Sequence, residues 1–182
     1  MRIASFLIGP SCLIGLLATP LVAHAQYFGT ETSTVSVSSV NAFPNEAYAS
    51  QTINYSQTTQ FINFVSPTPA KVTARLDIVL VKQSGSTFVL PVTSVSNPTS
   101  GYLNISPGLS RTASGSITIS NPITTIKSLY ASQQGSALPA GTYFYYYRCS
   151  GNGSVQMGSS IFTSAGSSAR QSQSNFGFNN LH

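Results

Sequence analysis

Very few side chains in this sequence can carry out acid–base chemistry. The chain has 182 residues, of which three are acidic, Glu31, Glu46 and Asp77, and two are histidines. Acid–base hydrolysis needs positioned titratable groups, and glycoside hydrolysis commonly needs two carboxylates that flank the bond. Glu31 lies in a Ser/Thr-rich N-terminal stretch, Glu46 in a predicted loop, and Asp77 in a predicted strand two residues after Arg75. The spacing therefore indicates no catalytic pair.

The sequence also has few residues that could carry out nucleophilic catalysis or bind a metal. His182 is the last residue and, beyond the N-terminal segment, the one histidine that could act as a base for Cys149 or a serine. Zinc sites need several Cys or His ligands, and calcium sites need clustered oxygen ligands that usually include carboxylates. The sequence predicts a protein that is not an enzyme, with no catalytic, cofactor-binding or metal site and no cofactor.

Tyrosines are the side chains best suited to a binding role. They gather in residues 138–149, where Pro139 and Gly141 give turn signals just before a dense aromatic run. The alternation of a strand divides this run between two faces. Tyr143, Tyr145, Tyr147 and Cys149 share one face, and Phe144, Tyr146 and Arg148 share the other. We therefore expect a central strand here.

Tyr145, Tyr146 and Tyr147 are candidate contacts for a glycan or a protein partner, because tyrosine combines apolar area with a polar tip. They fall on two faces and cannot all line one site, so core packing is the alternative for the Tyr143 face. Cys149 is either buried as a small apolar side chain or available for an intermolecular disulfide.

The N-terminus predicts export. Residues 1–25 contain Arg2, an apolar run over 3–23 that is broken by glycine and prolines, and an Ala23-His24-Ala25 site before Gln26. These features are typical of a cleaved secretory signal peptide, and cleavage would remove the other cysteine, Cys12. No later stretch is long and apolar enough to span a bilayer as a helix. We expect the mature chain to be secreted, periplasmic or on the cell surface.

The charge pattern argues against nucleic-acid binding. The formal net charge is +5, but charged residues make up 6% of the chain and the basic ones are scattered. Nucleic-acid-binding proteins usually concentrate Lys and Arg on one face or in one run. Ser, Thr, Asn and Gln fill the polar positions instead, which is an extracellular or surface-polymer composition.

The remaining elements read as short strands separated by turns. Residues 26–50 are predicted to form an N-terminal arm or edge strand, in which Val35 and Val37 alternate with Ser and Thr and Val40 follows. The cleanest period-2 segment is 72–81, and a Gly85 turn leads to a second strand over 87–95, which predicts a hairpin. Arg75 and Asp77 lie on the same side of the first strand and predict a surface ion pair.

Three later segments complete the prediction. Residues 123–130 are either a helix capped by Asn121 with Pro122 at its first position, or a strand. Asn152-Gly153 is a turn dipeptide that would fold residues 155–162 back as a hairpin. Residues 164–182 are Ser-, Gly-, Gln- and Asn-rich and predict a flexible polar tail. The predicted domain itself spans 51–163.

Two resemblances to known families follow from these residues. Gly141-Thr142-Tyr143, after Leu138-Pro139, resembles the start of a late strand in secreted immunoglobulin-like and fibronectin-like sandwiches, which implies that the Tyr143 hydroxyl bonds back to the preceding corner. In length, signal peptide and Ser/Thr/Asn-rich alternation, the chain is also similar to bacterial fimbrial subunits. That likeness implies a donor strand that contains Val35, Val37 and Val40.

The sequence thus predicts an all-β fold, an antiparallel β-sandwich of immunoglobulin-like or jelly-roll-like type. The expected function is that of an exported, non-enzymatic structural or adhesive surface protein that assembles by strand addition with itself or with another surface protein. The alternative is a carbohydrate- or ligand-binding module that uses exposed tyrosines.

Overall fold

The computed structural model describes residues 27–40, 50–171 and 177–179. The predicted signal peptide, Glu46 and His182 lie outside these residues. The described elements are β1 (Phe28–Val40), β2 (Ser50–Phe61), β3 (Thr68–Lys82), β4 (Thr87–Asn97), β5 (Leu103–Ile105), β6 (Ser110–Ile119), α1 (Pro122–Gln134), β7 (Thr142–Met157), β8 (Ser160–Thr163), β9 (Ser167–Arg170) and β10 (Gly177–Asn179).

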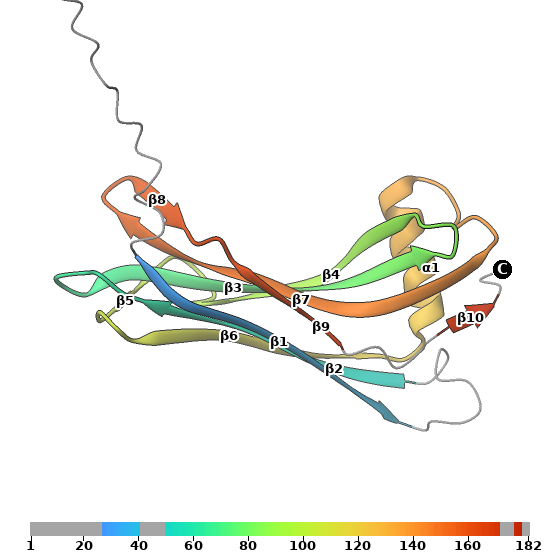
Figure 1. Ribbon diagram of the computed structural model, residues 1–182, viewed down its shortest axis with the longest axis horizontal. Coiled ribbons are helices and arrows are strands. Elements are labelled where there is room, and N and C mark those ends of the chain that lie inside the picture. The colour runs from blue at the N-terminus through green and yellow to red at the C-terminus, as the bar shows by residue number, and fades with distance from the viewer. Residues whose placement is uncertain (1–26, 41–49, 172–176, 180–182) are drawn as a thin grey trace, which may run out of the picture.

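The strands form two antiparallel sheets that pack face to face (Figure 1). One sheet is three-stranded, in the order β1-β2-β6. The other is seven-stranded, in the order β10-β7-β3-β4, with β5 paired to β3 and with β8 and β9 paired to β7. The predicted all-β sandwich is confirmed. Within the described residues, no helix is long and apolar enough to cross a membrane.

The core lies between the sheets and is built mainly by β3 and β7, which pair from Ala70↔Val155 to Lys82↔Tyr143. Alternate residues of β3 from Ala70 to Leu80 are fully buried against the facing sheet, as period-2 patterning requires. The β3–β4 hairpin is confirmed, with Leu80 opposite Phe88 and Val81 opposite Thr87.

The ambiguous segment after β6 is a helix. The Asn121 side chain accepts a hydrogen bond from the Thr124 backbone N–H at 3.1 Å, and Pro122 occupies the first turn. Gly135 ends the helix in the left-handed conformation, with φ 68°. The Tyr130 ring meets Phe88 of β4 edge-on, so α1 covers one end of the sandwich (Figure 1).

The predicted turn at Asn152-Gly153 is wrong, because β7 continues through both residues to Met157. The chain instead reverses at Gly158, with φ 61°, and β8 pairs back onto β7. Gly151 lies against the Thr73 carbonyl and Gln57, and Gly153 lies against Thr59, too close for a Cβ atom at either position. These glycines permit close approach of the two sheets rather than a turn.

The polar stretch after residue 163 departs from the predicted flexible tail in its described part. Ser167–Arg170 forms β9 and pairs with residues 148–151 of β7, and Gly177–Asn179 forms β10 and pairs with residues 142–144. Because backbone ladder bonds do not require apolar side chains, a Ser-rich segment can still complete the edge of a sheet.

The expected surface ion pair is also wrong in one respect, because Asp77 is buried. Its side chain is 1% exposed, and its two oxygens accept from Arg75 Nε at 2.6 Å and from Arg148 Nη2 at 2.9 Å. Arg148 faces Asp77 directly across the β3–β7 ladder, a partner that no local spacing could reveal.

Candidate functional site

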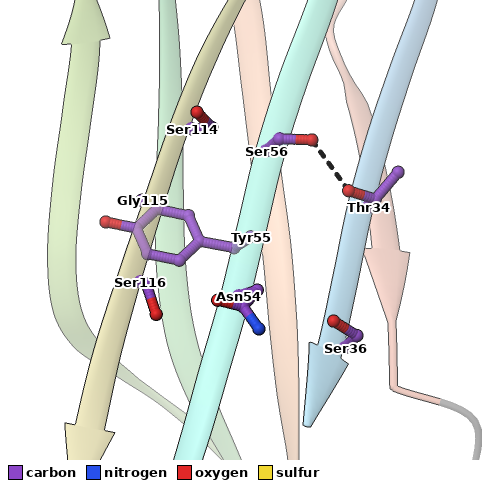
Figure 2. Close-up of a pocket in the computed structure, with 8 residues that line it drawn as sticks. All are labelled: Thr34, Ser36, Asn54, Tyr55, Ser56, Ser114, Gly115 and Ser116. Carbon is purple, nitrogen blue, oxygen red and sulfur yellow. Dashed lines mark hydrogen bonds between the residues drawn. The ribbon is translucent and has the colours of Figure 1, made fainter.

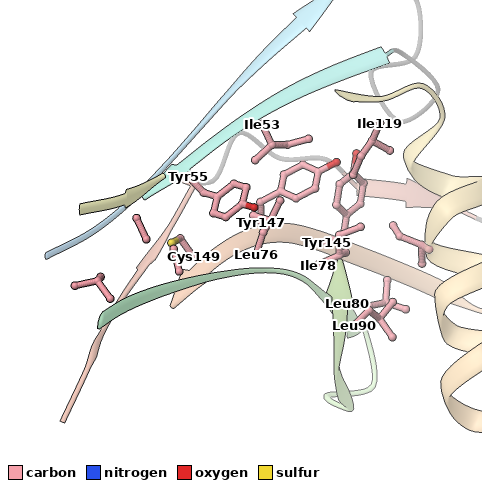
Figure 3. Close-up of a cluster of buried hydrophobic side chains, with 14 of the residues drawn as sticks. Ile53, Tyr55, Leu76, Ile78, Leu80, Leu90, Ile119, Tyr145, Tyr147 and Cys149 are labelled. Atoms are coloured by element: carbon pink, nitrogen blue, oxygen red, sulfur yellow. The ribbon is translucent and has the colours of Figure 1, made fainter. Parts of the chain in front are cut away.

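The tyrosine strand is mostly core. Tyr145 and Tyr147 are 4% and 0% exposed, and their rings meet edge-on inside the sandwich (Figure 3). Both hydroxyls donate to Gln51 Oε1 of β2, at 3.4 Å from Tyr145 and 2.7 Å from Tyr147. This bond satisfies polar atoms that would otherwise be costly to bury. Neither ring is available to a partner, which corrects their assignment as contact residues.

Tyr143 has the structural position that the resemblance implied. Its ring is fully buried, and its hydroxyl donates to the Pro139 carbonyl at 2.7 Å. The bond ties the first residues of β7 to the corner before it, so the predicted bond from the Tyr143 hydroxyl back to this corner is confirmed.

Tyr146 is the one predicted contact tyrosine that keeps a solvent-facing side. It lies half-buried on the outer face of the seven-stranded sheet, and the Arg170 guanidinium lies over its ring at 5.5 Å. Stacking of this kind fixes an aromatic ring while leaving its edge accessible.

Cys149 is fully buried, and its thiol donates to the Ser56 carbonyl at 3.3 Å. Desolvation by burial raises the pKa of the Cys149 thiol above its ordinary value, so the reactive thiolate is disfavoured. The apolar interpretation of Cys149 is therefore correct, and the alternative of an intermolecular disulfide is excluded in the folded chain.

The predicted donor strand lies in its own sheet. In β1, Val35 pairs with Tyr55, Val37 with Ile53 and Val40 with Ser50. Val35 and Val37 pack against the core. The N-terminal half of β1 is held further, because Glu31 accepts from Thr59, from the Gly153 N–H and from Ser164.

The other edge of β1 is unpaired within the described residues, because β1 is the terminal strand of its sheet. Its Thr34–Val40 half carries no charge, no proline and no bulge; the single register shift lies between Phe28 and Glu31. Natural edge strands are usually protected against pairing by at least one of these features. The sequence placed β1 correctly as an edge strand, but its pairing partner was not predictable from the strand itself.

The outer face of the three-stranded sheet is a regular array of small polar side chains. Its members lie in register across β1, β2 and β6 in four rows: Thr32, Thr58 and Thr112; Thr34, Ser56 and Ser114; Ser36, Asn54 and Ser116; Ser38, Thr52 and Thr118.

Neighbouring hydroxyls in this array bond across the strands. Thr34 and Ser56 are 2.8 Å apart, and so are Thr58 and Thr112. A shallow depression of about 430 Å³ lies over the middle rows, and Figure 2 shows the residues that line it. The Tyr55 ring packs against Gly115 on the opposite, core face of the sheet. The Ser/Thr repeat at every second residue was the sequence signal for this face.

Comparison with solved structures gives a distant likeness in fold. No family model and no curated protein matches the chain. Structural-genomics target SoR45 aligns at 11% identity and a TM-score of 0.35, over 79% of this chain and 87% of its own. Target BeR40 from Bordetella pertussis aligns at 13% identity and a TM-score of 0.35, over 82% of this chain and 97% of its own. The C-terminal domain of wzt aligns at 13% identity and a TM-score of 0.32, over 84% of this chain and 86% of its own. Similarities this low carry no argument about function.

Proposed function

We propose that this chain is an exported, non-enzymatic surface protein that associates with further copies of itself through the free edge of β1. The observation that carries the proposal is an uncharged strand edge, without proline or bulge over its C-terminal half, at the margin of the three-stranded sheet. This is a fimbria-like use of strand addition, except that β1 already occupies its own sheet and offers its second edge.

Two copies of β1 are suited to antiparallel pairing with each other. Pairing centred on Val37 places Ser36 of one copy opposite Ser38 of the other. It keeps Val35 and Val37 on the core face and the two serines on the outer face. The arrangement is isologous, since the same edge is used by both copies. Both edges of this sheet meet the other sheet at one end. Asn97 of β4 donates to the Thr112 carbonyl of β6 at 2.7 Å, and Ser33 in the N-terminal half of β1 bonds to Ser167 of β9 at 2.9 Å.

The non-enzymatic part of the proposal is supported by the carboxylates in the described chain. Asp77 is engaged by two arginines, and Glu31 accepts from three donors that tie together β1, β2 and β7. Carboxylates engaged in this way hold strands in place.

Lysine substitutions test the edge. In Ser36→Lys/Ser38→Lys, two lysine pairs would face each other across the new ladder, and like charges opposite each other cost up to about 1 kcal/mol per pair. We expect the monomer–dimer dissociation constant of the mature chain to rise roughly tenfold or more, measured by light scattering across a concentration series.

The matched control is Ser114→Lys/Ser116→Lys, which adds the same charge to the same outer face on β6. This control should associate as the unmodified chain does. A mature chain that stays monomeric at all concentrations, or a loss of association in the β6 variant alone, would refute pairing through β1.

Export has a separate test. The full chain, expressed with a C-terminal tag in a Gram-negative host, is expected outside the cytoplasm with Gln26 as its first residue, as N-terminal sequencing would show. Recovery of the uncleaved chain in the cytoplasm would contradict the proposed localisation while leaving association through β1 to be judged on its own.

A further inference from the structure

The outer face of the seven-stranded sheet gathers arginines that are far apart in sequence. The ladder places Asp77 beside Arg148, and Arg148 beside Arg170 of β9, in one row. Arg75 and Ser150 occupy the next row of the same face. We call the surface formed by Arg75, Arg148, Arg170 and Tyr146 the arginine strip.

The strip has an excess of positive charge. Among the described residues, Asp77 is the one carboxylate of the strip. Glu31 lies elsewhere, at the β1 side of the sandwich, where it accepts from Gly153 and Ser164. The strip therefore contains three guanidinium groups and one buried carboxylate, which pairs with Arg75 and Arg148. Their exposure differs, and the Arg75 and Arg148 side chains are 46% and 32% exposed.

Part of the donor capacity of the strip is unused. Arg148 Nε is buried and has no hydrogen-bond acceptor within the described chain. Arg75 uses Nε for Asp77, and its side chain remains 46% exposed. The exposed part of this guanidinium suits a planar anion, which can accept two parallel hydrogen bonds, whereas the buried Arg148 Nε is closed to an outside ligand.

A depression of about 340 Å³ adjoins the strip where the β8–β9 connection passes over β7. Arg75 lines it together with polar side chains of the outer face that can both donate and accept, namely Thr73, Ser150 and Asn152. A neutral hydroxyl and amide lining beside a cationic rim matches a ligand that carries many hydroxyls and few acidic groups.

We propose that the arginine strip and this depression bind an acidic saccharide. Its carboxylate or sulfate lies against Arg75 and Arg148, its hydroxyls bond to Thr73, Ser150 and Asn152, and a further sugar lies along the Tyr146–Arg170 stack. From Tyr146 to Asn152 the strand rises about 20 Å, the length of a short oligosaccharide. The site lies on the sheet opposite β1 and does not depend on self-association.

The described surface favours a saccharide over a nucleic acid. Phosphate-backbone recognition needs a longer run of cations and several aromatic platforms for bases. The strip itself has one aromatic ring, that of Tyr146, with Phe144 two residues away on the same face. Its neighbouring depression is lined by hydroxyl and amide groups, which match sugar rather than base edges.

Binding is tested by titration of the mature chain with three saccharide oligomers of equal length, namely an oligogalacturonate, a sulfated dextran and neutral dextran, and with a single-stranded DNA oligomer for comparison. Ser150→Asp places a carboxylate opposite Arg75, and Arg170→Gln removes the outermost charge, while neither breaks the Asp77 ion pairs. We expect either substitution to weaken binding of the acidic oligomers about tenfold. Lys127→Gln on α1 removes the same unit charge away from the strip and should change binding less than twofold.

Each result of these titrations either supports or overturns the proposed saccharide site. Binding of the uronate, of the sulfated oligomer or of both supports the site and identifies its anion, provided that Ser150→Asp and Arg170→Gln weaken it. Equal binding of neutral dextran, tighter binding of a single-stranded DNA oligomer, no binding, or equal losses in Lys127→Gln would each overturn the assignment.

Discussion

At the scale of single residues, the Tyr143 hydroxyl connects β7 to the corner that precedes it. Its bond to the Pro139 carbonyl is 2.7 Å long, and Tyr143→Phe would remove that bond while keeping the buried ring. We expect the free energy of unfolding in urea to fall by about 0.5–1.5 kcal/mol. Tyr146→Phe on the solvent side is the control, with little change. Equal losses in both variants would show that the corner bond contributes no specific stability.

Cys149 and Tyr147 make a second residue-scale prediction, about pH. Desolvation by burial raises the pKa of both groups above their ordinary values of 9.0 and 10.0, so the folded chain holds them neutral. Their contribution to stability is complete below those values and is lost as the pH rises above them, because the unfolded chain ionises first.

The measurement is the free energy of unfolding at about pH 8 and about pH 10. The unmodified chain should lose more stability over this interval than Cys149→Ala does. Native Cys149 should also react with a thiol reagent at the rate of unfolding. Rapid labelling, or covalent dimers on non-reducing gels, would contradict the buried thiol.

At the scale of elements, Gly151 shows how β7 approaches the facing sheet. A Cβ atom there would meet the Thr73 carbonyl and the Gln57 side chain. We therefore expect Gly151→Ala to destabilise the chain by about 1–3 kcal/mol in thermal or urea unfolding. Gly158→Asn, at the true turn, should be tolerated, because Asn adopts positive φ more readily than most residues. The reverse order would contradict the course of β7.

The predictable elements are those whose signal is local. The alternation over residues 72–81 and the turn at Gly85 depend on neighbours in sequence, and both appear where they were expected. The Asn121-Pro122 cap is also a local signal, and it belongs to the helix, one of the two alternatives left open for residues 123–130. The alternation of the tyrosine run divided its residues correctly between two faces but left open which face is buried.

What the sequence did not reveal depends on neighbours across the sheets. Asn152-Gly153 has the composition of a turn, but its glycine is needed for contact with Thr59 of the opposite sheet. From sequence alone Asp77 has the pattern of a surface residue, because its partner Arg148 is brought beside it only by the β3–β7 ladder. Tyr146 could be separated from Tyr145 and Tyr147 as a surface residue only once the covered face was known.

At the scale of the whole molecule, the two sheets present unlike outer faces. The outer face of the three-stranded sheet carries Ser, Thr and Asn in four rows, whereas that of the seven-stranded sheet carries the arginine strip. The free β1 edge belongs to the uncharged side, where no like charge opposes association. This separation allows one surface to serve self-association while the other remains open to a ligand.

Amide hydrogen exchange of the mature chain at low and high concentration tests association through β1 most directly. Backbone N–H groups on an edge exchange readily until a second strand pairs with them. If copies associate through β1, protection of amide hydrogens against exchange should rise with concentration in β1, mainly over Thr34–Val40, and stay constant in β4 and β6. Protection gained in β4 or β6 instead, or in no strand, would contradict association through β1.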